Sequence, residues 1–419
     1  MFARWSRRLS IPLISAILVG APVYWAFPDG LPFWRATGIV LGWVGWGLLL
    51  ASLLLMIREA PLAHWLGGLE RMYRWHHRLG MLAYAALLAH PLALSLDDWQ
   101  ESPGQAWAML SPLQQGWPEW SGWLALLLMM SGLACALARR MPYARWRWLH
   151  HLLSLAMLAA FFHLLLLGLD EIALATPLAA IGLIVWRVVR DDQGLAARPY
   201  LVASVERVDE SAVEVALRPL GDACALKPGQ FVLAAFFEGP SFRGCGEFHP
   251  FTASAIGADG RFSLTIKALG DCTRHLQWLE SGVAARVQGP FGAFMAESGD
   301  SPQFWLAGGI GITPFMARLR QGGLTQQVHL LYLHRDARDS AYTEELQRLA
   351  AAEPALSVEI VACGEKAANL EALMPAESEL LGRQCSLCGP PGLVAAAVAI
   401  LLGRGVPSGH IHFESFEFR

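Results

Sequence analysis

The sequence predicts a multidomain membrane protein with a six-helix transmembrane bundle, an antiparallel β-barrel and an α/β domain built on a parallel sheet. Of the 419 residues, 54% are hydrophobic and only 16% are charged, whereas soluble domains carry about 25% charged residues. Fifteen of the 17 Trp precede residue 190, and all three Lys follow it. Beyond that point the apolar runs become short and alternating, with Gly and Pro turns between them. The two halves therefore suit two different solvents.

Charge and cysteine content exclude two classes of protein. A net charge of −3 excludes a globally basic nucleic-acid-binding protein. Seven scattered cysteines, an odd number, do not make a disulfide framework. Cys385 and Cys388 form a single CxxC, which fits a redox pair or half of a zinc site. Without a second pair, we expect both to be structural cysteines. No partner subunit is evident from the sequence.

Six apolar stretches match a bilayer span of about 20 residues. They lie near 9–27, 36–57, 76–96, 120–138, 148–169 and 172–190. Arg-rich segments at the N-terminus, 58–78 and 139–147 alternate with acidic loops, which places both termini in the cytoplasm by the positive-inside rule. Trp residues at the span ends fit an interfacial belt. We expect a multi-pass protein of the cell (inner) membrane, in contact with the lipid bilayer.

Two predicted spans carry paired histidines: His76 and His90 in the third, His150 and His163 in the fifth. The pairs are separated by roughly 21 and 19–20 Å along their helices. Intramembrane imidazoles are costly, and they are natural axial ligands of haem iron. Two facing helices could thus hold two metal centres, one above the other. Interfacial or hydrogen-bonded core histidines are the simpler alternative, and we expect that role for the neighbouring residues His77, His151 and His64.

The spacing within the fifth span is unfavourable for a straight helix. Fourteen residues return to within about 40° of the same helix face, whereas thirteen miss it by about 140°. The spacing from His151 to His163 misses by about 120°. We therefore expect the fifth span to bend, to bulge or to present its two histidines from different faces.

The second half divides into two patterns. Residues 200–296 contain short alternating runs that predict a small antiparallel barrel, at Leu201–Val205, Val213–Leu217, Phe231–Ala235 and Phe262–Ile266. From residue 302 onward, apolar strands alternate with helical segments, which predicts a parallel α/β sheet. The strands are Phe304–Ala307, Val328–Leu333 and Val358–Val361, and the helices Pro314–Arg320, Tyr342–Glu353 and Gly392–Gly403.

A glycine-rich loop follows the first of these parallel strands. Residues 308–314 read Gly-Gly-Ile-Gly-Ile-Thr-Pro, in which the glycines allow close approach of a pyrophosphate. Pro314 stands at a helix start, where it needs no hydrogen-bond donor. The loop departs from the GxGxxG fingerprint at Pro314, and any βα turn can be Gly-rich. Alone it is suggestive only.

Further motifs strengthen this prediction. They are Glu247–Ser254 with its HPFT core, Ile266–Thr273, Cys388–Gly392 (CGPPG) and the C-terminal Phe-Glu-Phe-Arg. Their order resembles the ferredoxin-NADP reductase module.

This module is combined with six spans that carry paired histidines. In this combination the chain is similar to the NADPH oxidase/ferric reductase superfamily in its compact bacterial form, from about Ser10 to Arg419. The resemblance implies three domains: a two-haem transmembrane domain at 1–195, a ferredoxin reductase-type FAD-binding barrel at 196–298 and an NAD(P)-binding domain at 299–419.

The resemblance also implies site residues. FAD would be held by His249, Pro250, Phe251, Thr252, Ser254, Lys267, Gly270, Asp271, Thr273 and Phe418. NADPH or NADH would be held by Gly308, Gly309, Gly311, Thr313, Pro314, Arg335, Cys388 and Gly389. Thr252, Cys388 and Phe418 would act at the reacting rings, with Phe416 a weaker candidate than Phe418. An edge-strand core role is the alternative for Phe418.

The four histidines would ligate two b-type haems, His76 with His150 at the inner haem and His90 with His163 at the outer one. Electrons would pass from cytoplasmic NAD(P)H through FAD and the haems to an acceptor outside. We expect an oxidase that reduces O₂ to superoxide. A ferric-chelate reductase on the same path is the alternative, and a haem-containing transporter or scaffold a third. Leu94 stands where many NADPH oxidases carry another His, which weakens a dedicated oxygen site; Arg35 is a substitute or simply an anchor of span two.

The sequence leaves two questions open: whether the nucleotide is NADPH or NADH, and whether arginines bind the haem propionates. Near the second parallel strand, His334, Arg335 and Arg338 favour a 2′-phosphate, whereas Asp336 suits a free ribose. The cytoplasmic arginines could pair with the inner-haem propionates or act only as an orientation signal. These arginines are Arg74, Arg78, Arg145 and Arg147.

Overall fold

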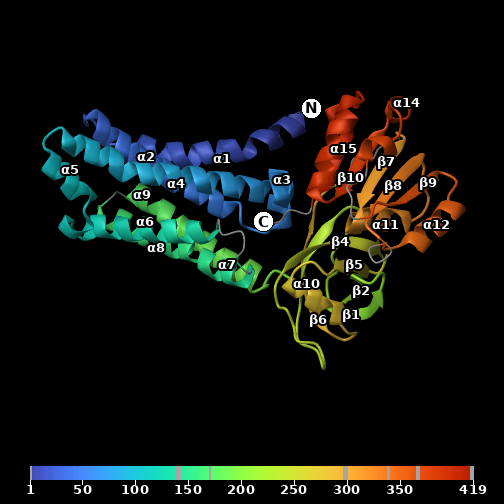
Figure 1. Ribbon diagram of the computed structural model, residues 1–419. Coiled ribbons are helices and arrows are strands. Elements are labelled where there is room, and N and C mark those ends of the chain that lie inside the picture. The colour runs from blue at the N-terminus through green and yellow to red at the C-terminus, as the bar shows by residue number, and fades with distance from the viewer. Residues whose placement is uncertain are drawn as a thin grey trace. The chain divides into compact units, whose positions relative to one another are not determined.

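The computed structural model describes residues 2–136, 141, 143–168, 171–295, 301–336, 340–364 and 369–415. The chain divides into two compact units, Met1–Gln193 and Gly194–Arg419. The first unit is helical, and the second contains a barrel and a sheet with its covering helices (Figure 1). The three finer domain ranges inferred from the sequence stay a prediction.

Helices occupy all six predicted spans, with additional short helices between them. They are α1 (Phe2–Ala26), α2 (Phe33–Leu54), α3 (Ala60–Leu66), α4 (Leu69–Trp99), α5 (Pro103–Leu110), α6 (Trp117–Ala136), α7 (Tyr143–His150), α8 (Leu152–Leu166) and α9 (Glu171–Trp186). Among the described residues, three helical segments are long and apolar enough to cross a membrane: Phe33–Leu54, Leu69–Trp99 and Trp148–Leu166. The unit is thus of a helical membrane type.

The helices pack in two main pairs, α2 along α4 and α6 along α8 (Figure 1). Trp43 and Trp46 of α2 share a buried apolar cluster with Met157 of α8 and Ala180 of α9. The indole of Trp46 donates a hydrogen bond of 2.8 Å to Thr176 Oγ1, which satisfies its polar nitrogen inside the cluster. Apolar packing with a few satisfied polar groups therefore joins both pairs to α9.

The fifth predicted span is interrupted at His151, which fits the expectation from its histidine spacing that it bends, bulges or presents the two histidines from different faces. The helix α7 ends at His150, and α8 begins at Leu152. At the break the His151 amide donates to the Trp148 carbonyl at 3.2 Å, which is a tighter i to i+3 contact than the α-helical pattern. A tightened turn rotates the residues that follow it. The break lies inside the span expected near 148–169, of which Trp148–Leu166 is still long and apolar enough to cross a membrane.

Ion pairs close the end of the helical unit near its junction with the second. The π-helix η2 (Arg187–Asp192) follows α9 directly. Asp191, only 1% exposed, accepts the Arg58 backbone N–H at 2.9 Å and lies 3.5 Å from Arg187. Arg190 Nε donates to Glu59 Oε1 at 3.0 Å. These contacts hold the end of α9 to the segment that follows α2.

The second unit begins with a closed antiparallel barrel in the order β1-β2-β5-β4-β3-β6. Its strands are β1 (Arg198–Arg207), β2 (Ala212–Pro219), β3 (Phe231–Phe236), β4 (His249–Ile256), β5 (Phe262–Lys267) and β6 (Ala284–Phe291). Alternating apolar residues fill its interior, among them Val215, Val232 and Leu264. The Tyr200 hydroxyl accepts the Cys224 N–H at 2.7 Å. The predicted antiparallel barrel is confirmed.

A parallel five-stranded sheet follows, in the order β11-β10-β7-β8-β9. Its strands are β7 (Gln303–Gly308), β8 (Val328–His334), β9 (Leu356–Ala362), β10 (Gln384–Gly389) and β11 (Ile411–Ser415). One face packs on α11 (Thr313–Leu319) and α12 (Thr343–Ala352), and the other on α13 (Leu370–Leu373) and α15 (Pro391–Gly403). Strands covered on both faces read as continuous apolar runs, as the sequence predicted.

A partly buried ion-pair network joins the barrel to this sheet. Arg320, which follows α11, makes a bidentate pair with Glu345 of α12 (2.7 and 2.8 Å) and a second pair with Glu214 of β2 (2.6 Å). Its guanidinium lies 4.9 Å from the ring centroid of Tyr342, whose hydroxyl is 2.6 Å from Thr265 Oγ1 on β5. Burial by itself lowers the pKa of Arg320, but its bonds to Glu345 and Glu214 raise it above the ordinary value.

We predict that Arg320→Ala lowers the free energy of unfolding of the second unit by about 3 kcal/mol, because two carboxylates lose their partner. Urea-dependent pulse proteolysis of the detergent-solubilised chain would measure this. Arg348→Ala, an exposed arginine of α12, is the matched control and should leave the unfolding midpoint unchanged. Equal midpoints for the two variants would contradict the assigned role of the network.

Candidate functional site

In the helical unit, two of the predicted ligand histidines face each other. His76 of α4 and His150 at the end of α7 have ring centroids 6.2 Å apart at an interplanar angle of 69°. His76 Nδ1 lies 3.0 Å from the carbonyl oxygen of Ser52 and 2.8 Å from its hydroxyl. His150 Nδ1 is buried and finds no hydrogen-bond partner within the described residues. The indole of Trp146 stacks on the His150 ring at 4.8 Å.

The other two predicted ligands have the same local arrangement. His90 Nδ1 lies 2.7 Å from the Gly38 carbonyl oxygen, and His163 Nδ1 lies 2.7 Å from that of Pro118. A carbonyl only accepts hydrogen bonds, so Nδ1 carries the proton in both rings. The Nε2 lone pair is then free for a metal. Metal-ligating histidines usually fix their second nitrogen in this way.

A glycine one helical turn beyond the acceptor makes room for each of these two rings. A Cβ at position 42 would lie 3.1 Å from His90 Nδ1, and one at position 122 would lie 3.0 Å from His163 Nδ1. Sequence reasoning did not find Gly38, Gly42 or Gly122. The only signal in the sequence is a glycine four positions after the residue whose carbonyl accepts the hydrogen bond. Both residues lie on a helix that carries none of the predicted ligand histidines.

The remaining histidines and arginines are placed differently. The side chains of His64, His77 and His151 are exposed. Arg35 lies 3.3 Å from Asp97 and 3.7 Å from Asp98, so it anchors the start of α2 to the end of α4. Arg74 faces Glu70 at 3.8 Å, and Arg78 lies over the Trp75 ring at 5.6 Å. The anchor alternative for Arg35 is therefore the one that these contacts support.

In the barrel, the HPFT motif forms the start of β4. Thr252 is 5% exposed, and its buried hydroxyl has no hydrogen-bond partner among the described residues. An unpaired buried hydroxyl is costly, so it fits a group that would accept or donate there. Ser254 instead donates to Glu214 Oε1 at 2.5 Å and is fully buried. Its hydroxyl is thus committed to the Arg320 network.

The second predicted FAD segment is the turn after β5. Thr273 Oγ1 accepts the N–H groups of Gly270 (2.8 Å) and Leu269 (3.0 Å), which fixes the turn into α10 (Asp271–His275). The exposed Asp271 carboxylate pairs with Arg274 at 2.7 Å. Lys267 is half-buried at the end of β5. The turn therefore presents backbone around Gly270, with Lys267 as the nearby predicted cation.

The glycine-rich loop lies at the carboxyl edge of the parallel sheet. It forms the 3-10 turn η4 (Gly309–Ile312), and Gly309 has φ +53°. A Cβ on Gly311 would collide with the Cys388 carbonyl group, only 2.6 Å from its carbon. From β7 the chain runs through β8 to β9 on one side of the sheet and then crosses over to β10 and β11 on the other side. The point where the strand order reverses therefore lies between β7 and β10. Ligands of open α/β sheets bind outside the strand ends at such a point.

Several predicted NAD(P) residues meet at this point. The two loops approach each other closely here. A Cβ on Gly311 would meet the backbone of Cys388 and Gly389, and a Cβ on Gly389 would lie 3.1 Å from the Gly308 Cα. Thr313 is buried and donates to the Ile310 carbonyl at 3.1 Å, and Pro314 is buried in α11. Arg335 directly follows the neighbouring strand β8. Phe418, Phe416 and Arg338 lie outside the described residues.

The two cysteines of the CxxC are buried and form no disulfide within the part of the chain that the structure describes. Cys388 is 1% exposed, and Cys385 is fully enclosed. Burial raises the pKa of the Cys385 thiol to about 11, against the lowering effect of Arg383. A neutral, enclosed thiol is inert towards exchange. The structure thus agrees with two structural cysteines.

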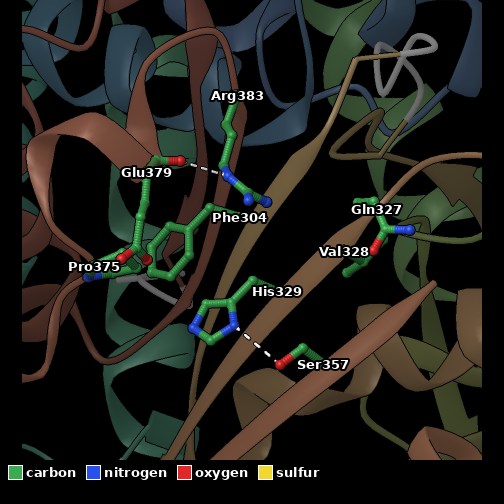
Figure 2. A pocket seen from close by; sticks show the side chains of 8 residues that line it. All are labelled: Phe304, Gln327, Val328, His329, Ser357, Pro375, Glu379 and Arg383. Carbon is green, nitrogen blue, oxygen red and sulfur yellow. Dashed lines mark hydrogen bonds between the residues drawn. The ribbon is translucent and has the colours of Figure 1, made fainter. Parts of the chain in front are cut away.

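A pocket of about 220 Å³ lies at the opposite, amino edge of the same sheet, and Figure 2 shows the side chains that line it. It is lined by Phe304, Gln327, Val328, His329, Ser357, Pro375, Glu379 and Arg383. His329 stacks on Phe304 at 5.8 Å and reaches Ser357 at 3.4 Å. Because nucleotides bind at carboxyl edges, this pocket is separate from the candidate nucleotide site.

Two family matches cover parts of both units. Residues 41–161 match the family described as "Ferric reductase like transmembrane component". Residues 305–399 match the family described as "Oxidoreductase NAD-binding domain". The first range holds three of the four paired histidines and part of the helix that carries the fourth, and the second holds the glycine-rich loop and the CGPPG motif.

Curated relatives are reductase components. That of the naphthalene 1,2-dioxygenase/salicylate 5-hydroxylase systems of Ralstonia sp, a ferredoxin–NAD(P)⁺ reductase, is 26% identical over 229 residues, covering 51% of this chain and 68% of the relative. The ferredoxin reductase component of 3-ketosteroid-9-alpha-monooxygenase from Mycolicibacterium smegmatis is 32% identical over 210 residues, covering 47% and 57%. The chain thus spans between 57% and 68% of the length of these relatives.

Two solved structures are also similar. The flavohem-like FAD/NAD-binding domain of nitric oxide dioxygenase from Vibrio cholerae aligns with a TM-score of 0.45 at 21% identity, covering 52% of this chain and 98% of that domain. A flavohemoglobin from Malassezia yamatoensis aligns with a TM-score of 0.48 at 17% identity, covering 93% and 100%.

The fold, the site and the family matches define a membrane-type flavoprotein oxidoreductase with an NAD-binding domain. The chain combines a ferric reductase-like transmembrane component with a ferredoxin reductase-like FAD/NAD-binding module, which is consistent with the NADPH oxidase/ferric reductase superfamily.

We predict that Gly311→Ala weakens NADPH binding by about ten- to hundredfold, because overpacking against Cys388 costs about 1–3 kcal/mol. A titration that follows nucleotide fluorescence would measure the affinity. Gly392→Ala is the matched control, since a Cβ there meets open space in the neighbouring CGPPG motif. Unchanged affinity in Gly311→Ala would contradict the proposed nucleotide position.

Proposed function

We propose that this protein is a transmembrane NAD(P)H oxidase that transfers electrons from cytoplasmic NAD(P)H, through FAD and two bis-histidine b-type haems, to O₂ on the outer face, giving superoxide. The observation that carries the proposal is the repeated fixing of histidine Nδ1 by an acceptor on a neighbouring helix. It leaves Nε2 unprotonated in three of the four predicted ligands. The fourth, His150, has a buried nitrogen without a partner in the described residues.

The residues present fit two haems. His76 and His150 would ligate the inner one. Their ring centroids lie 6.2 Å apart, close enough for both imidazoles to bind one metal, which would supply one-electron chemistry there. His90 and His163 would ligate the outer haem. The interruption at His151 lets α7 and α8 present His150 and His163 differently, despite their unfavourable spacing.

In the second unit, the predicted residues would bind and orient the two nucleotides. Thr252, with its unpaired buried hydroxyl, would lie at the flavin ring beside His249, Pro250 and Phe251. Lys267 and the Gly270–Thr273 turn would hold the FAD pyrophosphate. The backbone of Gly308–Gly311 would hold the pyridine dinucleotide, with Arg335 at its 2′-phosphate. Cys388 and Gly389 would flank the nicotinamide, and Phe418 would stack on the flavin.

Bound FAD would accept a hydride and release single electrons, which haem iron carries one at a time. The contribution of the chain is to place the groups. The Arg320 network would fix the nicotinamide site on the sheet relative to the flavin site on the barrel. A displacement of about 1 Å between reacting atoms can slow a reaction by about a hundredfold, so this support is part of the proposed mechanism.

The proposal places the protein in the cell (inner) membrane with six spans and both termini cytoplasmic. Its support is the alternation of Arg-rich and acidic segments along the six helices. The ion pairs of Arg35 with Asp97 and Asp98 would then lie at the outer face. The cluster of Arg58, Arg187 and Asp191 would lie at the cytoplasmic face.

A ferric-chelate reductase that uses the same electron path is the second candidate. The family match of residues 41–161 to a ferric reductase-like component favours it. Leu94, at the position of an additional His in many NADPH oxidases, packs on Gly38. The Leu94 side chain offers no polar group to oxygen. Because the two functions share the same electron path, only the identity of the electron acceptor distinguishes them.

We predict that His90→Ala removes one of two haems while NAD(P)H still reduces FAD, because the nucleotide sites lie in the other unit. Haem content from the pyridine haemochrome spectrum and reduction of an artificial dye would measure these effects. His77→Ala, an exposed histidine of the same helix, is the control and should keep both haems. Full haem content in His90→Ala would refute the ligand assignment.

The acceptor can be assigned on the purified protein loaded with FAD and haem. We predict NADPH-dependent cytochrome c reduction that superoxide dismutase suppresses, since superoxide is the reducing agent. Dismutase-insensitive reduction, together with reduction of a ferric chelate under argon, would replace the oxidase by the ferric-chelate reductase.

A further inference from the structure

A cysteine pair on the barrel, which the proposed electron path does not use, forms a cluster with His249 of the proposed FAD site. Cys245 and Cys272 are joined in a disulfide, with Cα atoms 6.0 Å apart, inside the ordinary range of about 4.4–6.8 Å. His249 Nε2 lies 3.9 Å from Cys245 Sγ. All three side chains are partly exposed, so small molecules in solution can reach them.

The backbone presents the two cysteines to each other independently of the bond between them. The N–H groups of Cys245 and Gly246 both donate to the Phe236 carbonyl, at 3.0 and 2.9 Å, which ties the loop to the end of β3. A Cβ on Gly244 would lie 2.6 Å from the backbone of Phe237, so the loop approaches that strand closely. Position 245 is therefore held in place.

Further contacts dock this loop on α10. The Phe242 ring stacks on the His275 ring at 4.9 Å, and His275 Nε2 also contacts the Arg243 carbonyl. Cys272 lies in the same short helix as His275. The loop and the helix are thus in contact at three places, of which the disulfide is one.

The two cysteines flank the two segments that are proposed to hold FAD. Cys245 lies four residues before His249, at the start of the HPFT strand, and Cys272 lies between Asp271 and Thr273 in the pyrophosphate turn. We propose that Cys245 and Cys272 form a reversible dithiol–disulfide site whose oxidised form ties these segments together and slows the release of FAD. This inference rests on the proposed FAD-binding function.

The chemistry is thiol–disulfide exchange with a small disulfide, such as glutathione disulfide. One thiolate of the pair attacks a sulfur of the small disulfide, forms a mixed disulfide and releases one thiolate. The second cysteine then attacks the protein sulfur and releases the other thiolate. The pair loses two electrons and two protons, and the small disulfide becomes two thiols. His249 is placed to accept a proton from Cys245. In a reducing compartment, such disulfides are typically transient or redox-sensing.

The first experiment maps the bond in the full chain in detergent. After treatment with glutathione disulfide or with dithiothreitol, free thiols are alkylated and the peptides are identified by mass spectrometry. We expect Cys245 and Cys272 to be linked after oxidation and alkylated after reduction, whereas Cys363, a half-buried free cysteine, is alkylated in both. Free Cys245 and Cys272 in both states, or a mole of bound zinc per mole of protein, would overturn the assignment.

The second experiment measures FAD release by flavin fluorescence after dilution. We expect release to be about tenfold slower from the oxidised than from the reduced protein, because the cross-link restricts both segments. Cys245→Ser should remove this difference, and Cys363→Ser should retain it. Equal release rates with the bond mapped would overturn the coupling alone. Absence of FAD binding in both states would overturn the proposed function and the coupling together, while the mapping still tests the bond.

Discussion

The helical unit depends on one constraint: an imidazole enclosed by apolar helices needs a partner for its N–H, and that partner decides which nitrogen stays available. His90 and His163 meet the constraint with backbone carbonyls, Gly38 on α2 and Pro118 on α6. A carbonyl inside a helix is normally shielded by the side chain one turn later. Glycine at positions 42 and 122 removes that shield. The pairing of the helices brings a carbonyl to each ring, the glycine leaves that carbonyl accessible, and the resulting hydrogen bond fixes the ring tautomer. Together these features avoid the cost of an unpaired buried polar group.

The second unit has a different constraint. It contains many polar groups, and these must be held in defined positions. At the carboxyl edge of the sheet, Gly311 brings the loop after β7 against the Cys388 carbonyl. Any side chain at that position would separate the two strand ends that define the switch point. Arg320 performs the equivalent task between sheet and barrel, because its two carboxylate partners come from α12 and β2. Only the Gly311 contact lies at the carboxyl ends of the parallel strands, where open α/β sheets bind their ligands.

The sequence predicts the elements far better than the contacts between them. Apolar periodicity found the helices and most strands, because burial of a face leaves a direct trace in the chain. The Arg320–Glu214 pair joins residues far apart in sequence, and neither lies in a motif, so no local pattern announces it. The Cys245–Cys272 bond was also missed, because an odd number of scattered cysteines argues against a framework without excluding one pair. A bend or bulge in the fifth span was predictable, since the spacing of His150 and His163 does not fit one face of a straight helix, and a break is found at His151.

The two halves of the chain differ in where their charged residues lie, and the proposed function depends on that difference. Among the described residues, the ion pairs of the helical unit involve residues at helix ends, such as Arg35 with Asp97 and Arg190 with Glu59. The interior offers imidazoles, which bind a metal without carrying a charge of their own. The proposed path would move electrons and leave protons behind in the cytoplasm. Each electron that moves outward then crosses the membrane potential, worth about 2.3 kcal/mol per 100 mV. With the cytoplasm negative, this term would favour the outward direction, so the proposed cytoplasmic placement of the second unit would also set the direction in which the proposed electron path is driven.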